Sequence, residues 1–315
     1  MTSLFIKVTN QMVTACNNHI TANGTLSVWE QDYATVQRKI SDCIQLHDRY
    51  IENYQRESRR FEEQVRLGRL DPSKRFDFSE IYIFGKYENF VKRVSNINEL
   101  LNTIKIFSSL KKCHIEGIDS INSNFDSIVE SIKRKPYDIL DHRRTDFNND
   151  FLDFKRDIDN LQGLLCNFMD NCFDKATTTE QVYVLINRFK KLNIACIDVD
   201  IQLKWEVYCK LYYETMLKIK RDYEECKTND SWHVPQDWPR RPGIVRCMEA
   251  WAQRITQPMN VLKQHAPRLI EAEYIKRNKL MGQIVMLHDK FGRLVLEWAQ
   301  MNYMNWFKNV DKKVT

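Results

Sequence analysis

The feature that most limits the fold is an unbroken helical spacing of apolar residues between Phe147 and Cys172. Steps of four and three residues separate Phe147, Phe151, Phe154, Ile158, Leu161, Leu165, Phe168 and Cys172. This alternation places the side chains on one face of a helix, in the a and d positions of a heptad repeat. Such an apolar stripe needs a partner helix to cover it. A stripe of this kind is more often buried inside the protein's own core than left open as a docking groove. The stretch therefore predicts a long helix inside a bundle.

Other stretches of the chain keep the same helical spacing, and none has the pattern of a strand. They predict helices at about 4–22, 29–65, 84–107, 115–133, 179–192, 196–226 and 243–257, and a last long helix after Pro267 that buries Leu287, Leu294 and Trp298. The sequence has only 8 glycines and 7 prolines, which suits long helices. We therefore predict an all-α fold, an elongated stack of antiparallel helical bundles with long amphipathic helices.

Local signals divide the chain into segments. Ser27 is a plausible N-cap for the second helix, and Asp71-Pro72 marks a loop after it. Three prolines make 227–242 the best hinge. The predicted domains are an N-terminal helix and linker (1–28), helical bundles (29–226), the hinge, and a further bundle (243–315). Near the end of that bundle, few residues are polar enough for a solvent-exposed helix face. Either another layer of structure covers this end or, as we favour, the sequence stops inside a domain.

Composition excludes several classes of function. No apolar run approaches the roughly 20 residues of a membrane span, and the start has no signal-peptide pattern. Nine cysteines are scattered singly, which favours buried thiols in a reducing compartment. The net charge of +6 is spread over mixed-sign helix faces, so neither nucleic-acid binding nor membrane insertion is expected.

Catalysis has no positive support. The only Gly-Lys pair is Gly85-Lys86, with Glu80 in place of the first glycine of a phosphate-binding loop and Tyr87 in place of its hydroxyl residue. The histidines are isolated, and His47 is more simply a core residue than a metal ligand. A cysteine–histidine pair formed in three dimensions stays open. We expect no cofactor, metal or catalytic residue.

Short motifs between the helices are more specific than the spacing. They are Phe78-Ser-Glu-Ile-Tyr-Ile-Phe-Gly-Lys-Tyr-Glu-Asn-Phe90 with Lys92-Arg93, His114-Ile-Glu-Gly-Ile118, Lys133-Arg-Lys-Pro-Tyr-Asp-Ile-Leu-Asp141, Phe147-Asn-Asn-Asp-Phe-Leu-Asp-Phe154 and, upstream, Cys43-Ile-Gln-Leu-His-Asp-Arg-Tyr50. In this order they resemble the first N-terminal region of dynein heavy chains. The resemblance runs from about Trp29 to Met259. It weakens at Pro239-Arg-Arg-Pro-Gly243, where Cys247 replaces a family tryptophan. The Lys-Pro-Tyr-Asp motif and the long loop at 227–242 favour an axonemal, outer-arm type of heavy chain over the cytoplasmic form.

The resemblance implies a structural and assembly module: the tail of a much larger motor subunit. Family tails bind intermediate chains, light chains and other heavy chains, and anchor the complex to cargo or, in cilia, to the doublet microtubule. The implied location is the cytoplasmic cytoskeleton, in the axoneme of the cilium. The ATP-hydrolysing ring lies further toward the C-terminus, so this segment is not expected to be an enzyme. The arm, the partner of each helix, and homo- or hetero-oligomeric pairing stay open.

The aromatic-rich end around Trp298, Tyr303 and Trp306 and the loop from Trp232 to Trp238 are the candidate partner contacts, because aromatic anchors dominate interface energies when they are not core. The candidates are Trp232, Trp238, Arg240, Arg241, Trp298, Tyr303 and Trp306. For any one aromatic residue among them, a place in the core is the commoner outcome. A non-motor helical scaffold of the spectrin-like or vesicle-tethering type is the alternative, and periodicity alone does not separate it from a dynein tail.

Overall fold

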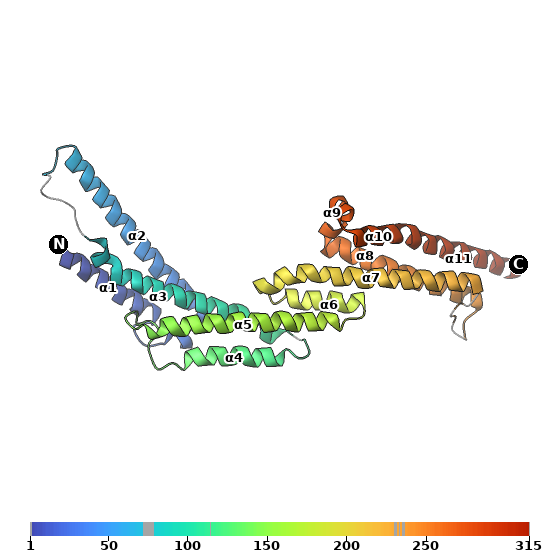
Figure 1. Cartoon of the computed structure of the whole chain (residues 1–315), viewed down its shortest axis with the longest axis horizontal. Coiled ribbons are helices and arrows are strands. Elements are labelled where there is room, and N and C mark those ends of the chain that lie inside the picture. The colour runs from blue at the N-terminus through green and yellow to red at the C-terminus, as the bar shows by residue number, and fades with distance from the viewer. Residues whose placement is uncertain are drawn as a thin grey trace. The chain divides into compact units, whose positions relative to one another are not determined.

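The computed structural model describes residues 2–71, 79–113, 115–229, 232, 234 and 237–314, except for the side chains of Thr2 and 311–314. Pro72, His114 and Pro235 lie outside this part. The described residues contain no strand, which confirms the all-α prediction (Figure 1). The helices are α1 (Thr2–Ile20), α2 (Tyr33–Arg66), α3 (Glu80–Phe107), α4 (Asp119–Lys133), α5 (Asp146–Asp174), α6 (Thr179–Lys190), α7 (Ala195–Asn229), α8 (Arg240–His265), α9 (Ala272–Arg277), α10 (Lys279–Leu287) and α11 (Arg293–Val314).

The chain forms two compact units, Met1–Leu165 and Cys166–Thr315, so the division falls inside α5. The sequence placed its best hinge at 227–242 instead. In the structure α7 runs to Asn229 and α8 begins at Arg240, three residues outside the predicted helix ends on each side. Compactness does not test the four predicted domain ranges, and they stay predictions.

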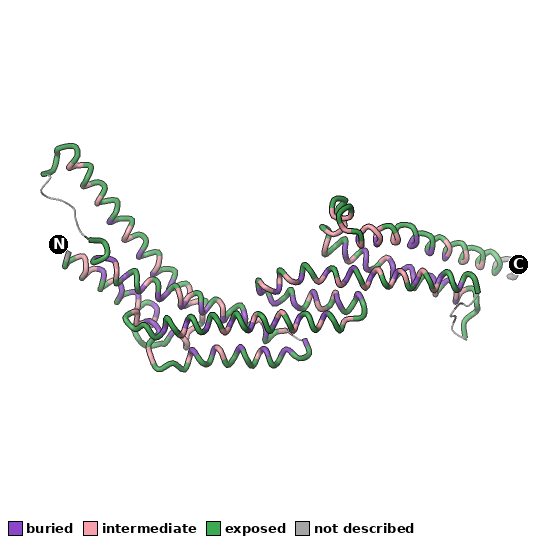
Figure 2. The backbone as a smooth tube through the Cα atoms, viewed as in Figure 1, coloured by how far each residue is buried: buried purple, intermediate pink, exposed green. Residues whose placement is uncertain are grey.

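In the first unit, α3 packs against both α1 and α2. The centre of α3 is buried through Tyr87, Phe90, Ile97 and Leu101. Ring contacts extend this core, since Phe107 of α3 stacks on Phe125 of α4 with centroids 5.9 Å apart. Figure 2 shows buried positions recurring along the long helices, as amphipathic spacing requires.

In the second unit, α7 packs against α6, α8 and α10, and α8 packs against α11. All the apolar residues predicted to face inward on α7 are buried: Ile197, Ile201, Trp205, Tyr208, Tyr212, Met216, Ile219 and Tyr223. The hydroxyls of Tyr208 and Tyr212 donate to the carbonyls of Pro258 (3.3 Å) and Ile255 (2.6 Å) on α8. Burial raises the pKa of both phenols, so these hydroxyls keep their protons and the α7–α8 contact keeps its donors.

The start of α2 differs from the prediction. Ser27 caps only a short 3-10 turn (Val28–Glu30), in which its N–H donates to the Glu30 carboxylate over 2.8 Å. The long helix begins at Tyr33, and its N-cap is Asp32, whose side chain accepts from the Thr35 N–H (3.0 Å). Asp32 is a second N-cap residue within the predicted helix, and it separates the 3-10 turn from α2.

The buried faces of two helices also differ from the predicted residues. On α5, Met169 and Phe173 are buried after Leu165 in place of Phe168 and Cys172. A straight helix has 3.6 residues per turn, so a strict 3.5-residue seam cannot stay on one face without supercoiling.

In the last helical region a π turn (His288–Gly292) lies between α10 and α11. Val295 and Ala299 are buried, whereas the sequence predicted burial of Leu294 and Trp298. The buried positions move by one residue because a π turn adds one residue to the helical path. None of the helices in the described part of the chain is long and apolar enough to span a membrane.

Candidate functional site

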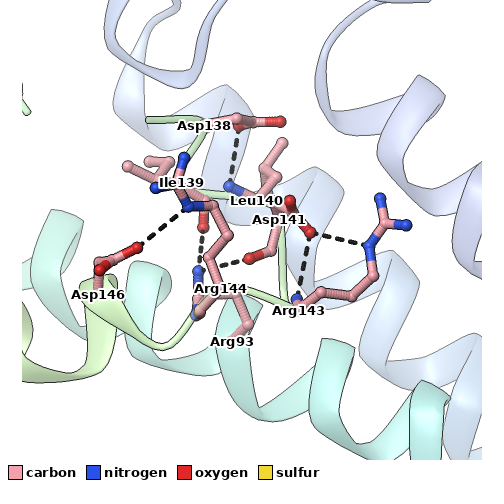
Figure 3. Close-up of polar contacts among 8 residues, drawn as sticks. All are labelled: Arg93, Asp138, Ile139, Leu140, Asp141, Arg143, Arg144 and Asp146. Atoms are coloured by element: carbon pink, nitrogen blue, oxygen red, sulfur yellow. Dashed lines mark hydrogen bonds and ion pairs between the residues drawn. The ribbon is translucent and has the colours of Figure 1, made fainter. Parts of the chain in front are cut away.

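A buried arginine organises the segment between α4 and α5 (Figure 3). Arg93 of α3 is 3% exposed, and its Nη1 donates to the carbonyls of Ile139 and Asp141, both at 3.0 Å. Its Nη2 donates to the carbonyl of Arg144, and its guanidinium lies 4.5 Å from the ring centre of Phe147. Burial lowers the pKa of Arg93, although nearby aspartates favour its charged form. One cation therefore holds three backbone carbonyls of this segment.

A second set of contacts fixes the start of this segment. Asp150 on α5 accepts from Lys135 (2.7 Å) and from the hydroxyl of Tyr137 (2.5 Å). Burial opposes the charge of Asp150, but these two hydrogen bonds outweigh it and lower its pKa. The Lys-Pro-Tyr-Asp motif and the Phe147–Phe154 motif therefore meet through these contacts, so both motifs have a structural role at the start of α5.

Three of the predicted contact residues come together at a recess in the second unit. Trp238 precedes α8, whereas Tyr303 and Trp306 lie on α11. They line a recess of about 190 Å³ with four residues of α8: Pro242, Val245, Arg246 and Glu249. Trp238 and Tyr303 are about half exposed, so their rings are open to a partner. We call these seven residues the α8–α11 recess.

The sequence search missed the four residues of α8. Successive members of this set are three, one and three residues apart, which places them on one face of a helix. This shared face is the sequence feature that could have indicated them. The signal is weak because Arg246 and Glu249 also fit an ordinary solvated ion pair, which they form at 3.4 Å. Only the packing of α11 against α8 shows that this face adjoins Tyr303 and Trp306.

Trp232 and Trp298 lie apart from the recess lining. Their rings stack on each other with centroids 5.4 Å apart, and Trp232 also approaches Trp251 at 5.9 Å. Trp298 packs edge-on against Tyr223 of α7 at 5.9 Å. Both tryptophans are half-buried in these intramolecular contacts, and their role as partner contacts stays a prediction.

The remaining candidates, Arg240 and Arg241, form the exposed first turn of α8. A helix N-terminus carries a partial positive charge, and this first turn contains no acidic residue. Two cations at this end repel the helix dipole and so lower the stability of the isolated helix. The same charges would attract an acidic group of a partner. The α8–α11 recess thus has aromatic walls, and the two residues that precede its Pro242 in the chain are basic.

No metal centre is found among the described residues. They contain no group of three histidine, cysteine or acidic side chains that could hold a metal ion. His47 is buried edge-on against Tyr87 at 4.8 Å, as a core histidine. Burial raises the pKa of the Cys209 thiol to about 12, which makes it a poor nucleophile.

A model of the family described as dynein heavy chain, N-terminal region 1, matches residues 1–315. The chain belongs to this family of dynein heavy chains. The motifs supported the resemblance only from Trp29 to Met259, whereas the match to dynein covers both ends as well.

The dynein relatives include axonemal and outer-arm chains. The sequence is 33% identical to dynein axonemal heavy chain 8 of Homo sapiens over 313 residues, which are 99% of this chain and 7% of that protein. It is 30% identical to dynein axonemal heavy chain 5 of Mus musculus over 312 residues, 99% of this chain and 6% of that protein. It is 29% identical to the dynein gamma chain of the flagellar outer arm of Chlamydomonas reinhardtii over 314 residues, 99% of this chain and 7% of that protein. The chain thus spans a small fraction of each relative's length.

Proposed function

We propose that this chain is part of the tail of an axonemal dynein heavy chain. In this role it is an assembly module that binds intermediate chains, light chains and neighbouring heavy chains, and so anchors the motor in the cilium. The full-length match to N-terminal region 1 and the axonemal names of the relatives support this role and an axonemal location. The segment itself acts without a cofactor and without turnover of ATP, which would belong to the motor region of the full-length protein.

The α8–α11 recess is the observation that carries the binding role. Its volume of about 190 Å³ is below the roughly 300–1,000 Å³ of small-molecule sites. A recess of this size suits one or two side chains of a protein partner. Tryptophan, tyrosine and arginine are the residue types most enriched at interface hot spots, and the recess contains all three. A partner that presents an apolar side chain beside acidic residues fits this surface.

The test is affinity capture with residues 1–315 as bait in ciliary extract, read by mass spectrometry. The variant Trp238→Ala/Tyr303→Ala removes two exposed walls of the recess and should reduce recovery of dynein intermediate or heavy chains. With a purified partner, loss of two hot-spot residues should weaken binding by at least about thirtyfold. Leu203→Ala is the matched control, because Leu203 is an exposed apolar residue on α7 of the same unit.

Capture of intermediate or heavy chains that is equal for the recess variant and the control would contradict the recess as the contact. Recovery of coat, tether or membrane proteins in place of dynein subunits would favour the alternative of a non-motor scaffold. That alternative shares the all-α architecture, but no observation on this chain favours it over a dynein tail.

A further inference from the structure

A basic cavity in the first unit has no role in the proposed assembly function. It encloses about 630 Å³ between α1, α3 and the segment that Arg93 holds in place. Lys86, Lys92, Arg93 and Arg143 contribute four permanent positive charges to its lining. The described residues that line it include no aspartate or glutamate. Its size falls within the range of small-molecule sites.

Most of this charge is not neutralised by the protein. Neither Lys86 nor Lys92 forms an ion pair with any residue that the structure describes, and both are exposed. Arg93 donates its Nη hydrogen bonds to neutral carbonyls, as described above. Only Arg143 has a carboxylate partner, Asp141, at 3.1 Å from its Nε.

The nearby acids are engaged elsewhere. Asp138 accepts from the backbone N–H of Leu140 (2.9 Å), and Asp146 pairs with Arg144 (3.0 Å). Neither of these carboxylates lines the cavity. The positive potential also acts on His142, whose pKa is lowered first by burial and then by Arg143, Arg93 and Lys86, against the opposing effect of Asp141.

Neutral donors complete the lining. Asn10 and Asn17 on α1, Asn89 on α3 and Asn148 on α5 line the same space, and each has a side-chain amide. Amide N–H groups and lysine ammonium groups are donors that phosphate oxygens accept, and a charged partner makes such bonds stronger. Clustered like charges destabilise the protein by mutual repulsion, and a bound anion would remove that cost.

We propose that this cavity binds a compact polyphosphorylated anion. Inositol polyphosphates and short linear polyphosphates share the required chemistry, several phosphate groups within one small molecule. Such a ligand would bridge α1, α3 and the segment after α4 and would stabilise the first unit by binding its folded form. This inference is independent of the α8–α11 recess, which lies in the second unit.

The test is isothermal titration calorimetry of the 315-residue chain with inositol hexakisphosphate, and separately with tripolyphosphate, in low salt. We expect saturable binding of one molecule, weakened by added salt because the attraction is between charges. The tighter of the two ligands identifies a ring or a linear chain of phosphates as the preferred form. Lys86→Gln/Lys92→Gln should weaken binding at least about tenfold, since two charged contacts are lost.

Arg49→Gln/Lys112→Gln is the matched control. It removes the same net charge from exposed positions on α2 and on the turn after α3, and it leaves the cavity unchanged. Affinity close to the unmodified chain is expected for this control. Absence of binding at 1 mM of either ligand (about 10⁻³ M, the weak end of measurable affinity) would overturn the proposal. Equal weakening by both double variants would also overturn it, because binding would then depend on net charge alone.

Discussion

At the scale of single residues, Arg93 is the side chain on which most of the local backbone depends. Its planar guanidinium reaches three carbonyls and lies over Phe147, a combination that a lysine ammonium cannot reproduce. Arg93→Lys should therefore lower the free energy of unfolding by about 2–3 kcal/mol, because charged hydrogen bonds contribute about 1.5–3 kcal/mol each and part of them is kept. Urea unfolding followed by circular dichroism measures this loss.

Arg143→Lys is the control for that experiment. Arg143 lies in the same segment but is exposed, and its ion pair with Asp141 is of the kind that contributes about 0–1 kcal/mol. The control should change stability by less than about 1 kcal/mol. Equal losses for the two substitutions would show that Arg93 does not hold the segment.

The candidate site was only partly predictable at this scale. Trp238, Tyr303 and Trp306 stood out because large aromatic residues near a loop or on an unbalanced helix face are recognisable in sequence. The cavity around Lys86 was not predictable, because its lining comes from helices far apart in the chain. In sequence, Gly85-Lys86 resembles only part of a nucleotide-binding loop, whose other residues this chain lacks.

At the scale of elements, helix existence was predictable and helix register was not. Periodic apolar residues predicted the long helices because burial of one face is what stabilises them. The π turn at His288–Gly292 moves the buried face of α11 by one residue, to Val295 and Ala299. Nothing in the local spacing separates this register from the regular one that would bury Leu294 and Trp298, because both choices offer an apolar stripe.

Deleting Asp289, an exposed residue of the π turn, tests whether α11 depends on this register. Loss of one residue lets the π turn become regular α-helix, so Val295 moves into the place that Leu294 would occupy in a regular helix and stays buried with Ala299. The deletion should therefore change the free energy of unfolding by less than about 1.5 kcal/mol, the lower end of what burial of a valine side chain contributes. Urea unfolding followed by tryptophan fluorescence reports the change through Trp298.

The matched variant for the deletion is Asp289→Ala, which removes the same carboxylate and keeps the chain length. It should change stability little, because Asp289 is exposed and its hydrogen bond joins it to the neighbouring His288 (3.0 Å). A deletion less stable than Asp289→Ala by more than about 1.5 kcal/mol would show that Val295 has lost its buried place and that the π turn does not hold an inserted residue.

At the scale of the whole molecule, the all-α class and the dynein family were predictable, and the compact units were not. The class follows from composition and spacing, which are properties of the chain taken locally. The division at Leu165 lies inside an uninterrupted helix, and the nearby Gly163 is itself helical, so no break in secondary structure marks it. Compactness depends on which helices pack together, and amphipathic faces alone do not specify their partners.

Each unit has its own buried core, so we expect damage to one core to leave the other unit folded. Leu101, fully buried in the first unit, and Ile255, fully buried in the second, are matched sites for substitution by alanine. Each change should cost its own unit about 2–5 kcal/mol through lost burial and a cavity. Hydrogen exchange read by mass spectrometry should then show faster exchange in α1–α3 for Leu101→Ala and in α7–α8 for Ile255→Ala.

Tryptophan fluorescence offers a second reading of the same experiment. Trp29 is the only tryptophan of the first unit, and the others (Trp205, Trp232, Trp238, Trp251, Trp298 and Trp306) lie in the second. Leu101→Ala should therefore shift the urea transition seen by circular dichroism and leave the main fluorescence transition in place. A fluorescence transition that moves as far as the circular dichroism transition would show that α5 couples the two units into one cooperative fold, because distant independent sites do not respond to each other.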